Sequence, residues 1–116
     1  MERKITGQKL GKSLKDPIEV AEMYYHLLSA VNKLNLTHRE IQLVAFTAVK
    51  GNISYANIRK EFCELYSSSS ASINNIISRL KKIGVFVKDG TKVKVNPAIV
   101  LNFENNIVLQ ITLKHG

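Results

Sequence analysis

The spacing of apolar residues changes once along this chain, at Gly84, and this change constrains the fold more than any other feature. Over residues 70–83, isoleucine and leucine recur every three or four positions, which is the period of an α-helix with one buried face. Over 85–88 and 91–95 the period is two, and the intervening Asp89-Gly90 is a strong hairpin signal. We therefore expect an amphipathic helix followed at once by a tight β-hairpin.

Three more helices are predicted upstream, each from capping residues and an apolar stripe. Their start and stop signals are, in order, Asp16-Pro17 and Asn35, the Thr37/Glu40 capping box and Gly51, and Ser54 and Tyr66. The expected buried faces are Val20, Tyr24, Leu27, Leu28, Val31 and Leu34 in the first helix, Ile41, Val44, Ala45 and Ala48 in the second, and Ile58, Phe62 and Leu65 in the third. The predicted fold class is mainly α with a small β-hairpin, and therefore α+β.

The chain of 116 residues has the length of one domain, and its two ends differ from its middle. Residues 1–15 are polar and basic, which predicts a flexible arm, and residues 16–100 form the expected folded domain. In the C-terminal extension, 101–116, apolar residues alternate with others in a strand pattern, carried by Ile107, Leu109, Ile111 and Leu113. Such a face packs on its own domain or on a second copy, so a homodimer is a possible assembly.

The net charge of +8 is concentrated in two segments. Residues 1–16 carry +3 and residues 72–96 carry +5, whereas residues 17–71 and 97–116 are each neutral. This separation favours a polyanionic partner, nucleic acid before membrane. The single cysteine, Cys63, forms no internal disulfide, and no apolar run approaches the length of a membrane span. These features predict a cytoplasmic protein.

The order of elements resembles a winged helix-turn-helix domain over residues 36–100. The resemblance is carried by S-Y-A-N-I-R-K-E-F (54–62), by S-I-N-N-I-I-S-R-L-K-K-I-G-V (72–85) as the recognition helix, and by V-F-V-K-D-G-T-K-V-K-V-N-P (85–97) as the wing. The same region is loosely similar to phage and plasmid replication initiators and to MarR-like regulators. The serine turn, Ser67–Ser70, is expected to exceed the three or four residues of a simple helix-turn-helix.

A helix of 100° per residue that buries the isoleucine stripe of 70–83 turns small polar residues and cations outward. Asparagine binds adenine and arginine or lysine binds guanine in the major groove, and serines at a helix start suit a phosphate. Lysines of the wing would reach the flanking backbone. The candidate DNA-binding residues are Ser70, Ala71, Asn74, Asn75, Ser78, Arg79, Lys82, Lys88, Lys92 and Lys94.

The expected function is non-catalytic binding of double-stranded DNA, most simply by a transcriptional regulator associated with the nucleoid. The alternatives are a phage or plasmid replication initiator and a winged-helix adaptor that binds protein through the same surface. RNA is a weaker candidate because no aromatic platform interleaves the lysines. We expect no catalytic residues, no metal and no cofactor, since histidines, Cys63 and carboxylates lack site spacing and no glycine-rich phosphate loop is present.

Overall fold

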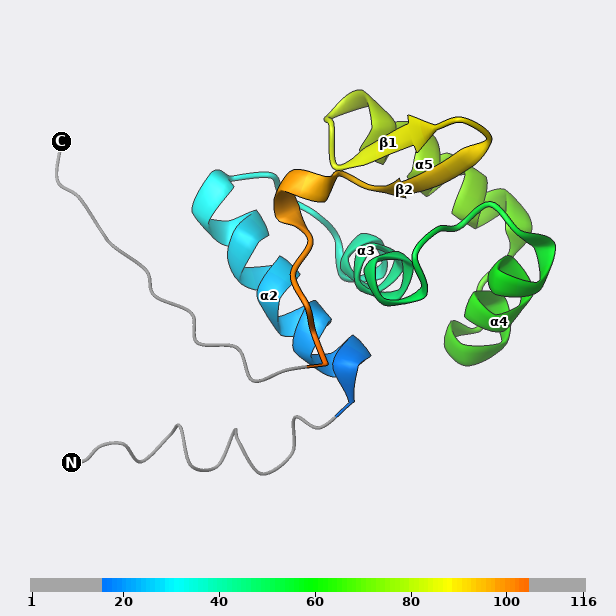
Figure 1. Ribbon diagram of the computed structural model, residues 1–116, viewed down its shortest axis with the longest axis horizontal. Helices are drawn as coiled ribbons and strands as arrows, with labels where there is room; N and C mark the ends of the chain where they lie inside the picture. Colours follow the sequence, from blue (N-terminus) through cyan, green and yellow to red (C-terminus); the bar gives the residue numbers. More distant parts are fainter. Residues whose placement is uncertain (1–15, 105–116) are drawn as a thin grey trace, which may run out of the picture.

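The structure is a computed structural model that describes residues 16–104. The predicted arm over 1–15 and the predicted strand with Ile107, Leu109, Ile111 and Leu113 lie outside these residues. The elements are, in order, α2 (Pro17–Asn32), α3 (His38–Lys50), α4 (Ala56–Tyr66), α5 (Ser70–Lys82), β1 (Phe86–Asp89), β2 (Lys92–Val95) and the 3₁₀ turn η2 (Pro97–Ile99). The predicted fold class is confirmed: helices precede an antiparallel hairpin in an α+β, winged-helix-like layout (Figure 1).

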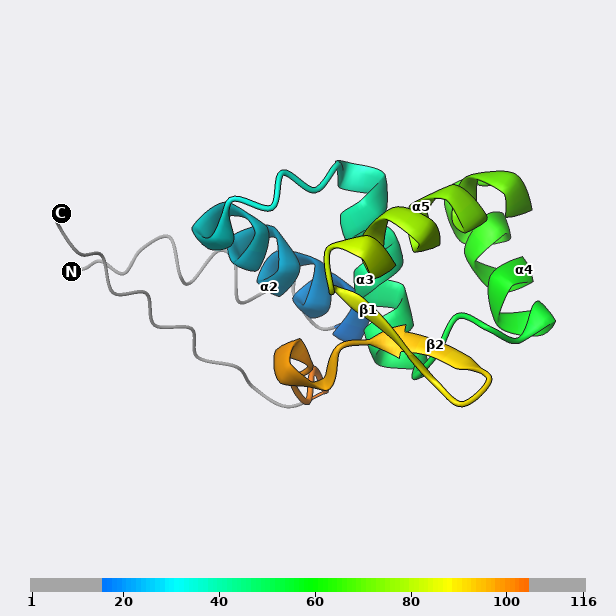
Figure 2. The ribbon, with the colours of Figure 1, turned by 90° about the horizontal axis from the view of Figure 1, so that it is seen from above.

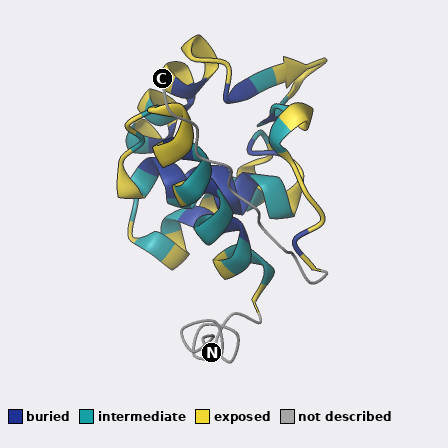
Figure 3. Ribbon diagram, turned by 90° about the vertical axis from the view of Figure 1, so that its left-hand side faces the viewer, coloured by how far each residue is buried: buried dark blue, intermediate teal, exposed yellow. Residues whose placement is uncertain are grey.

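Helix α3 lies at the centre of the described molecule. Figure 1 looks nearly along its axis, with α2 on one side, α4 on the other and the hairpin above. Because it has neighbours on several sides, its buried residues include the consecutive run from Leu43 to Thr47 rather than only the predicted stripe. Figure 3 shows the buried residues gathered between the elements and the exposed ones outside.

Most predicted helix ends are confirmed by the backbone. The Asp16 carboxylate accepts from the Ile18 N–H at 2.9 Å, and both hydrogen bonds of the Thr37/Glu40 capping box are present. Helix α5 ends in a Schellman arrangement, in which the Val85 N–H donates to the Leu80 carbonyl and Gly84 has a φ of 83°. Asn35 has the predicted left-handed conformation, with a φ of 57°, but it is not the cap, because α2 ends at Asn32 and its C-cap is Lys33, which is also left-handed.

The predicted stripes of α2 and α4 are confirmed in part. Of the stripe predicted for the first helix, Val20, Tyr24, Leu28 and Leu34 pack half-buried against the core. The most deeply buried positions of α2, however, are Ala21, Tyr25 and Ser29, and Val31 is 59% exposed. The burial of Tyr25 and Ser29 is tolerated because both have partners: the Tyr25 hydroxyl donates to the Ile99 carbonyl at 2.7 Å, and the Ser29 hydroxyl accepts from the Leu36 N–H at 3.1 Å.

In α4 the stripe continues from Phe62 to Tyr66 rather than to Leu65. The Tyr66 ring packs on Phe62 and Phe46, with centroids 4.7 and 6.4 Å apart, and Leu65 is 57% exposed. A similar aromatic contact covers α2, where Phe103 lies 5.7 Å from both Tyr24 and Tyr25. The chain after η2 thus returns along α2 and completes the core.

The sequence predicted that Ser54 caps the third helix, and this prediction is wrong. Helix α4 starts one residue later, with Tyr55 at the N-cap position and no side-chain cap. The Ser54 hydroxyl instead accepts from the Val93 N–H at 2.7 Å, and the Ile53 N–H donates to the Val93 carbonyl at 2.9 Å. These two bonds satisfy the outer edge of β2, so the hairpin is fastened to the chain between α3 and α4.

Candidate nucleic-acid interface

The outer face of α5 is made of small polar residues and cations. All seven predicted contact residues on this helix are exposed: Ser70, Ala71, Asn74, Asn75, Ser78, Arg79 and Lys82. Ile73, Ile77 and Leu80 are buried beneath them. Ile83, predicted to be part of the buried stripe, is 42% exposed because it is the C-cap residue and has left the helical path. Lys81 is also exposed, although it is not among the predicted contact residues.

The turn between α4 and α5 is shorter than predicted. It contains only Ser67, Ser68 and Ser69, since Ser70 already begins the helix. Ser67 has a φ of 53°, the left-handed conformation that glycine often supplies in such turns. The Ser69 hydroxyl caps α5 by accepting from the Ser72 N–H at 3.1 Å. The two helices are therefore joined by a turn of ordinary helix-turn-helix length.

Asn74 is held by an arginine from the preceding helix. Arg59 donates from Nε to the Ile53 carbonyl at 2.9 Å and from a terminal nitrogen to Oδ1 of Asn74 at 2.7 Å. Arg59 is not among the predicted contact residues because it lies in the neutral part of the chain. Its contact with Asn74 depends on how α4 and α5 pack, which no local pattern reveals. Asn75, the neighbouring exposed amide, is not engaged by this arginine.

Arg79 is shared between the surface and the interior. Its guanidinium donates to Oε1 of Glu40 at 2.7 Å, and the same oxygen accepts from the Thr37 N–H at 2.9 Å. The Glu40 side chain is only 8% exposed, whereas that of Arg79 is 43% exposed. The pair connects the C-terminal half of α5 to the first turn of α3, and one edge of the guanidinium still faces solvent.

The register of the hairpin divides its three lysines between two faces. Lys88 pairs with Val93, and Asp89 pairs with Lys92, so the turn consists of Gly90 and Thr91 rather than Asp89-Gly90. Residues directly opposite share a face, and successive residues alternate. Lys88 therefore shares the face of Phe86 and Val95, whereas Lys92 and Lys94 point to the other face.

The lysines of that second face already have neighbours. The Lys94 ammonium lies 3.0 Å from the carboxylate of Asp89, and the Lys92 ammonium lies over the Tyr55 ring at 5.7 Å from its centroid. Lys81, Lys82, Lys88 and Lys92 make no ion pair with any residue between 16 and 104. The positive charge of residues 72–96 is thus mostly uncompensated within the part of the chain described.

The hairpin runs back along α5. Figures 1 and 2 both place its tip and the N-terminus of α5 at the same end of the molecule, beside α4. The start of α4 lies at this end too, and the Lys92 ammonium near the hairpin turn lies over the ring of Tyr55, the N-cap residue of α4. The helix face, the turn of the hairpin and the start of α4 therefore surround one end of the molecule.

His26 and His38, on separate helices, stack with ring centroids 5.7 Å apart. Within residues 16–104, no group of three histidine, cysteine or carboxylate side chains has a metal-binding arrangement. None of the helices from α2 to α5 has the length and apolar character to cross a bilayer.

Comparisons of the chain with models of protein families, with curated proteins and with solved structures find no match.

Proposed function

We propose that this protein binds double-stranded DNA without catalysis, inserting α5 into the major groove. The observation that carries the proposal is the exposed face of α5, where small side chains allow close approach and Lys81 and Lys82 make no ion pair with a described residue. Free N–H groups at the start of a helix and lysines along its end suit phosphates on opposite sides of a groove. Transcriptional regulation is the simplest biological role for such binding, and initiation of replication would use the same contacts.

Within this proposal, the residues of the surface have different roles. Asn75 reads a base edge, since an asparagine amide pairs with adenine through two hydrogen bonds. Lys88 and Lys92 at the hairpin bind the flanking phosphates. Lys94, paired with Asp89, contributes less than its formal charge suggests. Ser70 and Ala71 bring backbone N–H groups close to a phosphate oxygen.

The rival proposal is an adaptor that binds a protein partner. Exposed apolar side chains favour it, since Val31 and Leu65 are 59% and 57% exposed. They lie on α2 and α4, outside the face of α5, so a protein contact there is compatible with DNA binding through α5. A homodimer is one form of this contact. Light scattering at micromolar concentration distinguishes a dimer from a monomer.

Fluorescence anisotropy of a labelled random-sequence duplex, titrated across a salt series, tests DNA binding. If about 4–6 phosphates are neutralised, log K falls against log salt with a slope of roughly −4 to −5. Lys88→Gln should reduce the steepness by about 0.9, the effect of one lost phosphate contact. Lys33→Asn is the matched control, because it removes the same charge at the C-terminal end of α2, away from α4 and the tip of the hairpin. Asparagine tolerates the left-handed φ of 56° at this position.

Failure to bind the duplex at low salt would remove the DNA proposal and leave the adaptor. Equal loss of slope in the Lys88 and Lys33 variants would indicate nonspecific attraction by total charge rather than docking of this surface.

A further inference from the structure

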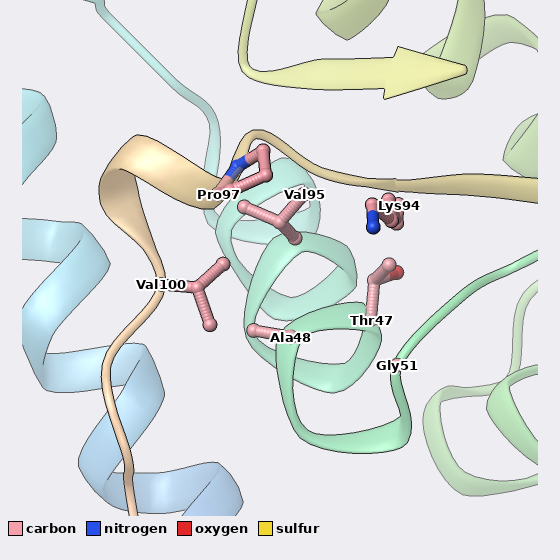
Figure 4. A pocket seen from close by; sticks show the side chains of 7 residues that line it. All are labelled: Thr47, Ala48, Gly51, Lys94, Val95, Pro97 and Val100. Carbon is pink, nitrogen blue, oxygen red and sulfur yellow. The ribbon is translucent and has the colours of Figure 1, made fainter. Parts of the chain in front are cut away.

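A pocket of about 350 Å³ opens between the C-terminal end of α3 and the chain from β2 through η2 (Figure 4). Its volume lies within the range of small-ligand sites. Ala48, Val95, Pro97 and Val100 form an apolar wall, on the left in this view. Thr47 and Lys94 form the polar side, on the right. The lining includes no residue of α5, so this pocket is separate from the proposed DNA-binding face.

Thr47 provides the first sign of a ligand. Its side chain is fully buried, and its hydroxyl oxygen has no hydrogen-bond partner. Burying a hydroxyl without a partner opposes folding, because the group loses its hydrogen bonds to water. A ligand group that accepts from this hydroxyl would remove the penalty.

Lys94 provides the second. Lys94 is one of the lining residues of the pocket, and its partner Asp89, at the end of β1, has a side chain that is 68% exposed. An ammonium has three N–H donors. When its only partner is one solvent-exposed carboxylate, it can donate to a second acceptor as well. A flexible lysine stem also allows movement, which is needed for a ligand to reach the buried Thr47 hydroxyl.

We propose that this pocket binds a small monocarboxylate with a short branched hydrocarbon body. The carboxylate would accept from Lys94 and Thr47, and the hydrocarbon would lie against Val95, Val100 and Ala48. The carbonyl end of α3, at Gly51, repels an anion, so the site depends on the lysine charge. Asp89 competes with the ligand for that charge. The proposal does not depend on DNA binding.

The test is a titration of the full-length, ¹⁵N-labelled chain with sodium isovalerate, followed by amide chemical shifts, against sodium chloride at equal ionic strength. Isovalerate should give saturable shifts centred on Gly51, Val95 and Val100, with a Kd on the order of 1 mM. The uncharged isovaleramide should bind at least about 10-fold more weakly, since it lacks the charge that Lys94 recognises.

Variants separate the two polar groups. Thr47→Val should weaken isovalerate binding by about 5-fold or more while keeping or raising the melting temperature, and Thr47→Ser should retain binding. Asp89→Asn should tighten binding by about 3-fold, because the competing carboxylate is gone. Non-saturating shifts spread over surface lysines would overturn the proposal. Equal affinity in the Thr47→Val and Thr47→Ser variants would overturn it as well.

Discussion

Two neighbouring asparagines on α5 have different surroundings, and this difference has a consequence for base recognition. Oδ1 of Asn74 already accepts from Arg59, whereas Asn75 is not held by that arginine. Bidentate pairing with adenine needs both the oxygen and the nitrogen of an amide, so in the proposed DNA complex Asn75 is the better reader. Asn74, fixed in place, is better suited to a single donor contact through its NH₂ group.

We expect Asn75→Ala to lose about 1–3 kcal/mol of discrimination between the preferred duplex and one with the contacted adenine replaced. Asn74→Ala should lose less than half of this. Competition binding with paired duplexes, after selection of a preferred sequence, measures both. A larger loss for Asn74 would show that Arg59 orients the base-reading amide instead of occupying it.

Tyr25 links burial to pH. Burial in the core, with a smaller contribution from Tyr24, raises the pKa of the Tyr25 phenol well above its ordinary value. The folded state therefore keeps its proton where the unfolded chain loses it, above about pH 10. Above that pH the unfolded state binds fewer protons than the folded state. The contribution of Tyr25 to the free energy of unfolding is therefore fully present below about pH 10 and falls as the pH rises.

Urea unfolding between pH 8 and pH 11 should show a decline that approaches about 1.4 kcal/mol per pH unit for this group above pH 10. Tyr25→Phe should be less stable at pH 8 by about 1–2 kcal/mol, since the Ile99 carbonyl loses its donor. Its decline with pH should be shallower than that of the parent. Parallel curves for the two proteins would contradict this assignment. Burial also raises the pKa of Tyr66, which therefore contributes to the decline in stability that remains in the Tyr25→Phe variant.

At the scale of elements, the turn before α5 contains a position that glycine would fit better. Ser67 ends α4 with a φ of 53°, and its N–H donates to the Cys63 carbonyl. A non-glycine residue in the left-handed region costs about 1–2 kcal/mol. Glycine removes this strain but is more disordered in the unfolded chain, which takes back about half of the gain.

Ser67→Gly should therefore stabilise the domain by about 0.5–1 kcal/mol in urea unfolding. Ser78→Gly is the matched control, because it makes the same change at an exposed position within α5 and should destabilise by about 0.5 kcal/mol. A loss of stability in the Ser67 variant would show that its side chain contributes more than its backbone conformation costs.

The contact between α5 and α3 rests on Glu40, which belongs to a capping box and to an ion pair at once. Glu40→Ala should cost about 2 kcal/mol, because it leaves the Thr37 N–H and the Arg79 guanidinium without their acceptor. Glu61→Ala removes a carboxylate paired with Lys50 at 2.8 Å, but the Glu61 side chain is 45% exposed, so its loss should cost less than about 0.5 kcal/mol. Chemical unfolding of both variants checks the contrast, which equal losses would contradict.

The sequence was sufficient for features that depend on neighbours along the chain. The capping box at Thr37, the glycine ends at Gly51 and Gly84, and the hairpin after α5 all follow from residues within a few positions of one another. The exposed face of α5 follows from the same periodicity. The hairpin turn was misplaced by one residue, since Asp89 and Lys92 remain paired and Lys88 lies opposite Val93 rather than Thr91.

What the sequence did not reveal depends on packing between distant segments. The partners of Arg59 and Arg79 lie 15 and 39 positions away, and both contacts engage side chains of the candidate surface. The burial of Tyr25 and Ser29 requires the chain near Ile99 and Leu36 to satisfy their hydroxyls. Apolar periodicity alone treats such polar atoms as obstacles to burial, so the predicted stripe, whose Val20, Tyr24 and Leu28 do pack against the core, omitted the more deeply buried Ser29.

For the whole molecule, the bonds from Ile53 and Ser54 to Val93 determine when the hairpin can become native. The Ser54 contact closes a loop of 39 residues that contains all of α4 and α5. Closing such a loop is entropically unfavourable until those helices are in place. The outer edge of β2 should therefore form after the transition state for folding.

Stopped-flow kinetics can check this order of events. Ser54→Ala, which costs about 1 kcal/mol, should speed unfolding about 5-fold and leave the refolding rate nearly unchanged. Thr37→Ala, which removes a local cap, should slow refolding if α3 forms early. Slower refolding in the Ser54 variant would show that the bonds to Val93 already form in the folding nucleus. If these two bonds to Val93 form late, they also break first, so the hairpin can detach and return while the helices remain folded.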